Sequence, residues 1–393
     1  MKRITTISLV GFLGAVSVYL LLLSHLLGNV FNNTIIYLVI SVCGVVCFLH
    51  NLKDLTANKR LTVFLLFFVF VFFSTLVNFQ FSISSLIYSV LWFFVFNIAF
   101  SVSLSSARFL KIVTICFFIA FLAIVMSSYF YGTIVNINGF YTVTAVYYLI
   151  CFIPFVLLIK QKLLKIVLFS SVVVISILSF KRGALLAIGL IMAIFIIYYL
   201  FKKKKKGVTP KSFVYLFAFA GLIFFLYLIV DNKYGVSKIL SVWQYRSDTG
   251  ANSGFFGDVR SEIYLDVLKL SFSSNPFQLL LGHGYDSVIL NTSYELSAHN
   301  DLLEILFDFG LIACFFYFVF LIMLITKTKK VEQKKIYSYL SFLIIFIVIG
   351  LVSHMITYPT YVYILMIYLG IFERSELYEN RNINIPSRLQ LRS

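Results

Sequence analysis

The sequence predicts an all-α polytopic membrane protein. Of its 393 residues, 61% are hydrophobic and only 12% are charged, a balance that soluble globular domains do not reach. Apolar runs long enough for a helix to cross a bilayer core of ~30 Å recur along nearly the whole chain. These runs must be helical, because unpaired backbone groups are costly in lipid and the alternating pattern of a membrane barrel does not occur.

About twelve membrane-spanning helices are predicted. No small-residue cleavage site follows the first of them, so we expect it to remain as a membrane helix rather than to be removed as a signal peptide. The predicted spans are residues 8–27, 34–50, 61–78, 82–103, 108–130, 141–159, 164–180, 183–201, 211–230, 302–325, 337–356 and 359–373.

The basic residues are concentrated in alternate connections between these spans. The chain has 32 lysines and arginines against 15 acidic residues, and most of the basic residues lie in every second connection, counted from Lys2 and Arg3. By the positive-inside rule these connections and both termini are cytoplasmic. The net charge of +17 is therefore explained by topology, and no nucleic-acid partner is expected. The run Lys202–Lys206 is a topology anchor on this interpretation, and contact with anionic membrane lipids is compatible with it.

The spans and one long connection predict four regions. Residues 1–230 form an N-terminal bundle of about nine helices, and residues 231–301 form a large extracytoplasmic loop. Residues 302–373 form about three C-terminal helices, and residues 374–393 form a cytoplasmic tail. A connection as long as residues 231–301 is usually functional rather than a simple linker.

The five cysteines all fall inside predicted spans, so no disulfide or zinc framework follows from them. Cys43 and Cys47 are one helical turn apart and are interpreted as small core residues. The sequence contains no DxD motif or other metal cluster, so we expect neither a metal ion nor a cofactor.

A basic pair lies on the side that otherwise lacks lysine and arginine. Lys181 and Arg182 occupy the hairpin "SFKRGALL" between two predicted spans. They either extend toward lipid headgroups or form an anion site, since one helix ends and another begins there and helix N-termini favour negative charge.

The long loop contains a predicted amphipathic helix in "GDVRSEIYLDVLKLSFSSNP". Asp258 can cap it, Pro276 ends it, and an apolar stripe follows helical spacing, so the helix can lie on the membrane surface. Arg260 falls in the first turn, where it either binds a phosphate or is a solvated charge beside Glu262. The stripe consists of Val259, Ile263, Val267 and Leu270.

Ionisable residues enter an apolar run in "SAHNDLLEILFDFGLI", residues 297–312. Asp301 and Glu304 fit a capping box, and carboxylates in a first turn complement the helix dipole. Asp308 lies one turn deeper, where a carboxylate should face protein or a water-filled cavity. Gly310 allows another helix to approach. The imidazole of His299, just outside the membrane, can exchange protons near neutral pH.

These features together resemble the O-antigen ligase and Wzy-type polymerase superfamily of bacterial glycan assembly. The resemblance covers about 130 residues: Arg182 in the short hairpin, Arg260 early in the long loop, the pair Gly282 and Gly284, and "HNDLLEILFDFGL", from His299 through Asn300 to Leu311. One departure follows this motif, where Ala313 and Cys314 stand in place of a second small glycine.

The resemblance implies a glycosyltransferase with an all-helical, C-type membrane fold that acts on undecaprenyl-diphosphate-linked sugars at the outer face of the cytoplasmic membrane. In this family's chemistry Arg182 and Arg260, with Lys181, hold the diphosphate. His299 acts as general base on the acceptor hydroxyl or supports the departing diphosphate, and Glu304 orients or tunes it. Asn300, Asp301, Asp308, Gly282, Gly284 and Gly310 have structural roles in the motif.

Three functions remain open at this point. A polymerase transfers the growing glycan to the next lipid-linked repeat unit, and the aromatic-rich N-terminal spans favour this reading. A ligase transfers a finished glycan to a lipid A core or to a protein. A transporter or flippase is the third, although the first six spans lack any convincing internal charge and the large outer loop has no counterpart in the first half. A chain-length regulator and a flippase are possible partners of a polymerase.

Overall fold

The structure is a computed structural model that describes residues 6–26, 32–78, 83–102, 114–115, 118–119, 121–122, 142–179, 182–203, 259–293, 295–353 and 361–383. Within these ranges the chain is helical and contains no strand. Among the described residues, four stretches are long and apolar enough to cross a membrane: Thr6–Ser24, Asn33–Ala57, Lys59–Val77 and Asp301–Lys330. The all-α membrane class is thus confirmed.

The helices follow the predicted spans closely, except for residues 108–130 and 211–230, which lie mostly or wholly outside the described ranges. The N-terminal part contains α1 (Thr6–Leu26), α2 (Asn33–Ala57), α3 (Lys59–Val77), α4 (Ile83–Ser101), α6 (Thr142–Cys151), α7 (Ile153–Leu157), α8 (Lys162–Ser179) and α9 (Arg182–Lys203). The C-terminal part contains α12 (Val259–Ser273), α13 (Pro276–Leu281), α14 (Ser287–Asn291), α15 (Asp301–Glu304), the π-helical turn η1 (Ile305–Phe309), α16 (Gly310–Lys327), the 3₁₀ turn η2 (Thr328–Lys330), α17 (Ile336–Val352) and α18 (Val362–Ile383).

Asparagine side chains fix the starts of the first long helices. The side chain of Asn32 accepts hydrogen bonds from the backbone of Thr34 and Ile35 at the start of α2. Asn58 separates α2 from α3 and accepts from the backbone of Arg60 at 3.1 Å. Each cap satisfies backbone N–H groups that the first turn of a helix leaves without partners.

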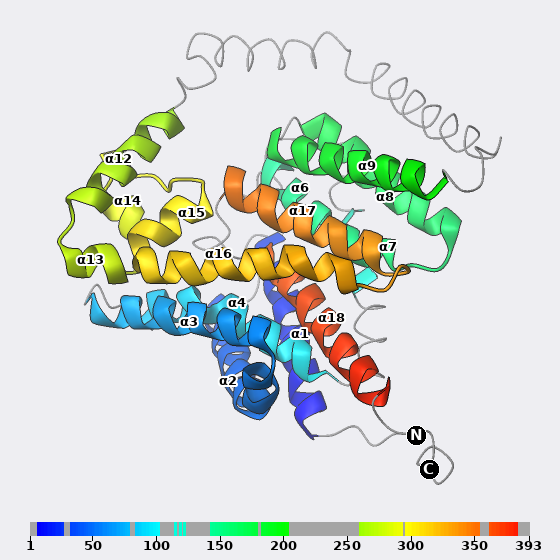
Figure 1. Cartoon of the computed structure of the whole chain (residues 1–393), viewed down its shortest axis with the longest axis horizontal. Coiled ribbons are helices and arrows are strands. Elements are labelled where there is room, and N and C mark those ends of the chain that lie inside the picture. Colours follow the sequence, from blue (N-terminus) through cyan, green and yellow to red (C-terminus); the bar gives the residue numbers. More distant parts are fainter. Residues whose placement is uncertain are drawn as a thin grey trace.

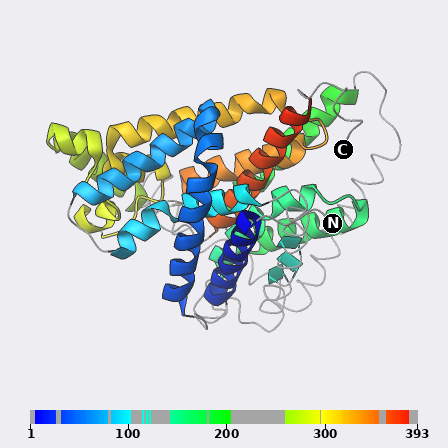
Figure 2. The same ribbon diagram turned by 90° about the horizontal axis from the view of Figure 1, so that it is seen from below.

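Helices α3 and α16 lie side by side and antiparallel, as Figures 1 and 2 both show. Aromatic rings join them along their length. Phe64 stacks on Phe320 with ring centroids 4.5 Å apart, and Phe70 stacks on Phe316 at 5.3 Å. Because these stacked rings hold the two helices together, α3 also supports the turn that precedes α16.

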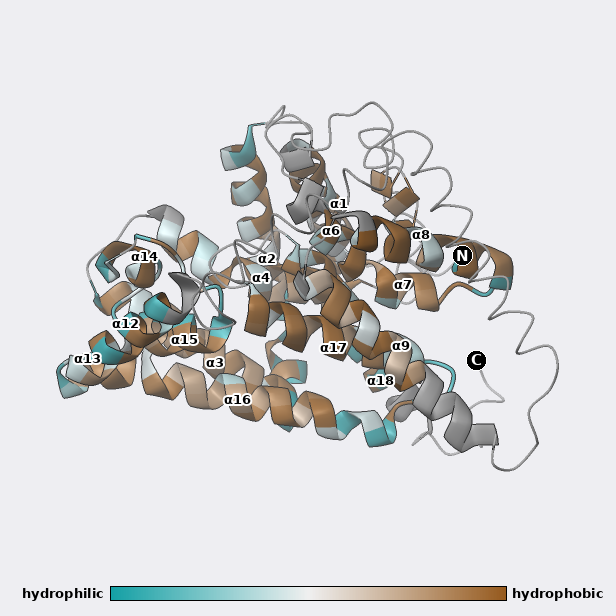
Figure 3. Ribbon diagram, turned by 90° about the horizontal axis from the view of Figure 1, so that it is seen from above, coloured by the Kyte–Doolittle hydropathy of each residue, from teal (hydrophilic) through white to brown (hydrophobic). Residues whose placement is uncertain are grey.

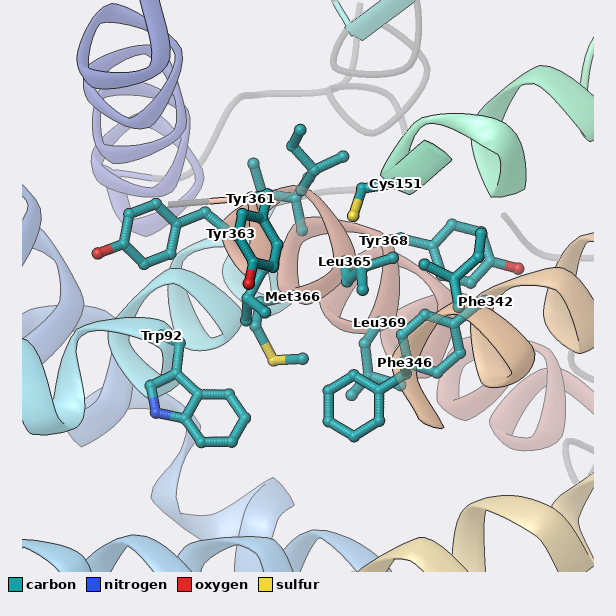
Figure 4. Close-up of a cluster of buried hydrophobic side chains, with 14 of the residues drawn as sticks. Trp92, Cys151, Phe342, Phe346, Tyr361, Tyr363, Leu365, Met366, Tyr368 and Leu369 are labelled. Carbon is teal, nitrogen blue, oxygen red and sulfur yellow. The ribbon is translucent and has the colours of Figure 1, made fainter. Parts of the chain in front are cut away.

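The core of the bundle surrounds α18. Its residues from Val362 to Phe372 are buried on all sides, among Trp92 of α4 and Phe342 and Phe346 of α17 (Figure 4). Gly370 permits close approach to α4, since a Cβ there would meet the carbonyl oxygen of Phe96 at 2.6 Å. A helix that is apolar all round belongs in such an interior position.

One end of the bundle carries a buried network of ion pairs, and we call it the charged end. Glu373 on α18 is 1% exposed and pairs with Arg60 of α3 and with Lys327 of α16, whose Nζ lies 2.9 Å from Glu373 Oε1. Arg374 pairs with Asp54 of α2 at 2.9 Å. These residues come from connections that the charge pattern assigns to one side of the membrane, and the structure brings them together.

The described part of the long loop folds into α12, α13 and α14 and covers the opposite end of α3 and α16, which we call the site end. Ile263 and Val267 of α12 are buried in a small cluster with Val288, Ala298 and Phe307. The predicted apolar stripe of α12 thus faces protein. Any contact of α12 with the membrane must therefore be made by other residues, because η1 and α14 cover Ile263 and Val267.

Candidate functional site

The predicted span 302–325 is not one continuous helix. It begins as α15, passes through the π-helical turn η1, and restarts at Gly310, whose φ is +80°. A π-helical turn and a residue with positive φ interrupt the regular ladder of helix hydrogen bonds. The break therefore leaves backbone carbonyl groups near the site end that require other donors.

The segment "LGHGYDS" supplies those donors. The backbone N–H of His283 donates to the carbonyl oxygen of Phe307 at 3.0 Å, and that of Gly284 donates to the carbonyl oxygen of Asp308 at 2.7 Å. The hydroxyl of Ser74 on α3 also donates to Asp308 O, at 2.9 Å. The irregular backbone at this depth is thus satisfied by protein, as a membrane environment requires.

Glycines make this contact possible. A Cβ on Gly282 would lie 2.2 Å from the carbonyl oxygen of Asp308, and one on Gly310 would lie 2.3 Å from that of Leu280. Gly282 and Gly284 have φ of +82° and +97°, values that side chains disfavour. The side chain of Asn78 on α3 connects the same segment to α3 by donating a hydrogen bond to Gly282 O at 3.0 Å. The glycine pair thus serves a close backbone approach.

His283 connects η1 to the end of α12 at the site end. Its ring stacks on Phe307 with centroids 4.1 Å apart. Its Nδ1 lies 3.1 Å from the carbonyl oxygen of Phe307, and its Nε2 lies 3.0 Å from the hydroxyl of Ser274 after α12. The imidazole thus joins the end of α12 to η1.

The histidine motif begins just before α15. His299 is half-buried and has a φ of +52°, which is uncommon for a residue with a side chain. Asn300 caps α15, accepting from the backbone of Leu302 at 3.0 Å and of Leu303 at 3.4 Å. The buried Glu304 accepts from the backbone N–H of His299 at 3.2 Å. Ser297 Oγ lies 3.4 Å from His299 Nδ1.

This geometry corrects the predicted capping box. Asn300, not Asp301, is the N-cap, because Asn300 has the extended backbone that precedes the helix and Asp301 is the first helical residue. Glu304 reaches back beyond the cap to His299 instead of capping the helix itself. A carboxylate and a left-handed backbone together fix where His299 lies.

Tyr285, at the site end, is influenced by the charges of three carboxylates. Tyr285 is buried, and burial raises the pKa of its phenol, as do the charges of Asp286, Asp308 and Glu304. Asp308 is fully buried, and its Oδ1 accepts from the backbone of Val288 in α14 at 2.9 Å. Asp308 thus faces protein, one of the two environments expected for it. No group of His, Cys, Asp or Glu suited to a metal ion occurs among the described residues.

The predicted diphosphate-binding residues are only partly described. Lys181 lies outside the described residues, and so do the side chains of Arg182 and Arg260; their backbones form the start of α9 and the first turn of α12. The start of α9 lies close to the end of α17, since a Cβ on Gly183 would meet Val352 at 2.5 Å.

Both helix starts lie near the histidine motif. Asn300 Nδ2 donates to the carbonyl oxygen of Leu351 at 3.4 Å, which joins the motif to the end of α17 beside α9. Ile263, one turn after Arg260, shares its buried cluster with Ala298, the residue before His299. Segments far apart in the sequence thus converge on the site end.

Sequence reasoning missed Ser74, Asn78 and His283. Ser74 and Asn78 are one turn apart in an otherwise apolar stretch, "FFSTLVNF", and polar residues with this spacing in a span indicate a contact with protein. His283 lies between the two glycines, and nothing in its immediate sequence indicates that its ring reaches Phe307 and Ser274.

The carboxyl of Asp286 lies outside the spans, and burial raises its pKa from 3.8 to about 6. The protonated form is therefore favoured by folding, and this contribution is complete below pH 3.8 and is lost as the pH rises through about 6. We expect Asp286→Asn to raise the free energy of unfolding at pH 8 by about 1 kcal/mol, a value reduced because the side chain is partly solvated, and to have little effect at pH 4. Thermal unfolding of both proteins in detergent across this range tests it; an equal effect at both pH values would contradict it.

The comparisons with known proteins support the resemblance seen in the motifs. Residues 166–318 match a protein family described as O-antigen ligase. A search of curated proteins finds no match. The matched segment begins within α8, includes the start of α9 and the long loop, and ends within α16, so it contains all three segments that converge at the site end. Residues 166–318 are therefore similar to the O-antigen ligase family, in a chain whose described residues include four helices long and apolar enough to cross a membrane.

Proposed function

We propose that this protein is a bacterial surface polysaccharide polymerase. It transfers a glycan from an undecaprenyl-diphosphate carrier to a lipid-linked repeat unit, as a metal-independent, inverting glycosyltransferase of the C-type fold with about twelve spans. The observation that carries the proposal is the convergence of the start of α9, the first turn of α12 and the His299 motif at one end of the bundle. The family match spans the same three segments.

The chemistry requires an anion site beside a base. Arg182, Arg260 and Lys181 bind the diphosphate oxygens, the arginines by paired N–H contacts. His299 accepts the proton of the acceptor hydroxyl as the new bond to the sugar C1 forms on the face opposite the leaving group. The bond from C1 to the diphosphate breaks, and undecaprenyl diphosphate leaves with the bonding electrons. The configuration at C1 is inverted.

Glu304 is a positioning residue in this proposal. Its Oε1 accepts from the backbone N–H of His299 and so holds the motif against α15. Asn300 anchors the same turn to α17 through Leu351. The imidazole is thereby held on a structured turn of the protein. A general base requires such positioning, because it must lie within hydrogen-bond distance of the bound hydroxyl.

The charge pattern supports a topology for this activity. The charged end is cytoplasmic and both termini lie on that side, by the positive-inside rule. The site end, with the loop of residues 231–301, then lies on the extracytoplasmic face of the cytoplasmic membrane, where the lipid-linked glycan is presented after a flippase has acted. A chain-length regulator is a further expected partner.

A ligase is the second candidate, and the description of the matched family, O-antigen ligase, favours it. Both activities use the same donor, and only the acceptor differs. Gel analysis of surface glycan from a strain lacking the gene distinguishes them. Single repeats attached to the final acceptor indicate a polymerase, long chains left on the lipid carrier indicate a ligase, and an unchanged ladder contradicts both.

The arginine in the first turn of α12 gives a test of diphosphate binding. We expect Arg260→Lys to lower transfer about tenfold or more, because lysine cannot make the paired contacts of a guanidinium. The KM for the lipid-linked donor should rise while the amount of folded protein is unchanged. Lys334→Arg, at a side chain that is 88% exposed at the charged end, is the matched control. Full activity of Arg260→Lys would show that paired contacts to phosphate are not made.

A further inference from the structure

The outer face of α12 and α13 exposes large apolar side chains. Leu265 and Phe272 of α12 are 58% and 69% exposed, and Phe277 and Leu280 of α13 are 54% and 47% exposed. Leu265 and Phe272 lie on the face of α12 opposite the buried Ile263 and Val267. Exposed apolar side chains gathered on adjacent helices indicate an interaction surface rather than chance.

A lysine lies between the exposed apolar residues of α12. Leu265, Lys269 and Phe272 follow the spacing i, i+4 and i+7, so they form one stripe, and Lys269 is itself exposed. A lysine on such a stripe can lay its apolar stem along hydrocarbon while its amine reaches a headgroup phosphate. The stripe thus has the composition of a helix at a membrane interface.

This surface continues the lipid-facing side of α16. Five residues of α16 with helical spacing are between 40% and 61% exposed along a membrane-spanning helix, which identifies the side that meets lipid. α13 ends against the start of α16, where Leu280 O approaches Gly310. Figure 3 shows α13 beside this end of α16 at the same edge of the molecule. The five residues are Leu311, Phe315, Phe318, Ile322 and Ile325.

We propose that residues 259–281 form an interfacial hook that lies in the bilayer surface at the site end. Phe272 and Phe277 enter the boundary between headgroups and acyl chains, and Lys269 contacts lipid phosphate. The occupant of this surface is thus a phospholipid bilayer with anionic headgroups, continuous with the lipid that surrounds α16. The hook is a separate feature from the proposed chemistry and does not depend on it.

The hook has a mechanical consequence for the site. His283 and Gly284, which follow the hook in the chain, donate to backbone carbonyl groups of η1, and the ring of His283 also bonds Ser274 at the bend of the hook. A hook held at the bilayer surface therefore sets the depth of η1 and of the turn that carries His299.

Tryptophan fluorescence in vesicles tests the hook. Phe272→Trp and Phe277→Trp are made in the full chain and reconstituted into phosphatidylethanolamine and phosphatidylglycerol vesicles with brominated or ordinary acyl chains. The emission of the parent protein, including that of the buried Trp92, is subtracted. Leu290→Trp is the matched control, since Leu290 is 64% exposed but lies on α14, outside residues 259–281.

The hook predicts that brominated lipid removes most of the emission added at residues 272 and 277, whereas aqueous iodide quenches the emission added at residue 290. Quenching of the added emission at residues 272 and 277 by iodide but not by brominated lipid would overturn the proposal. Shielding of both positions from both quenchers, together with cross-linked dimers, would assign the surface to a second copy of the chain and would also overturn it.

Discussion

Replacement of His299 by asparagine is expected to reduce glycan transfer by at least about 100-fold, the usual contribution of a general base. Asparagine tolerates the left-handed backbone, so the φ of +52° at this position is preserved while the imidazole is lost. The loss should appear in the rate of transfer at saturating donor, since His299 acts on the acceptor hydroxyl and not on the binding of the diphosphate.

The control for this variant is His50→Ala. His50 is exposed on α2 and is remote from the motif, so its loss should leave transfer unchanged. Both proteins are purified in detergent, and the lengthening of a lipid-linked oligosaccharide is measured. Transfer within a few-fold of the wild type in His299→Asn, with His50→Ala unaffected, would exclude His299 as the base.

The second large effect concerns Gly282. We expect Gly282→Ala to lower the free energy of unfolding by about 3 kcal/mol or more, because a Cβ would overlap Asp308 O at 2.2 Å and the residue has φ of +82°. The strain falls on the contact between the long loop and η1, so transfer should be lost together with stability. Thermal unfolding in detergent measures the first effect and the transfer assay the second.

Gly189→Ala is the matched control for Gly282→Ala. Gly189 lies in α9 with nothing within 4 Å of a built Cβ, so alanine should leave the unfolding midpoint unchanged or raise it through higher helix propensity. A Gly282→Ala protein that unfolds at the same temperature as the Gly189→Ala protein would contradict the close approach of the glycine segment to η1.

Hydropathy was sufficient to predict the helices of most described segments, four of which are long and apolar enough to cross a membrane. α2 begins next to a capping asparagine, and α18 is apolar through its buried half. Both features can be recognised from the neighbouring residues in the sequence. The break at η1 was not predictable, because "LLEILFDFGL" is an apolar run that only Glu304 and Asp308 interrupt, at helical spacing. The break is stabilised by His283, Gly284 and Ser74, which are distant in the sequence.

The spacing of α12 predicted its buried residues but not what covers them. Ile263 and Val267 are buried as their periodicity indicates, yet a stripe alone does not distinguish a membrane surface from another helix. The exposed Leu265 and Phe272 break the simple pattern of one apolar face, and this irregularity was the signal for the interfacial hook.

The histidine motif was predicted in part. Its position before a membrane helix was correct, but the cap was assigned one residue too late, since Asn300 and Asp301 have similar capping preference and only backbone geometry separates them. The role of Glu304 as an acceptor for the backbone of His299 also depends on the left-handed turn, which sequence does not reveal.

The most direct test of the central claim is transfer by the purified wild-type protein in vesicles supplied with a synthetic undecaprenyl-diphosphate-linked repeat unit, with EDTA present. The account predicts longer lipid-linked oligosaccharides and release of undecaprenyl diphosphate in equal number to the bonds formed, with inverted configuration at each new linkage. An unchanged oligosaccharide that is instead moved from one leaflet to the other would contradict it and would identify a transporter.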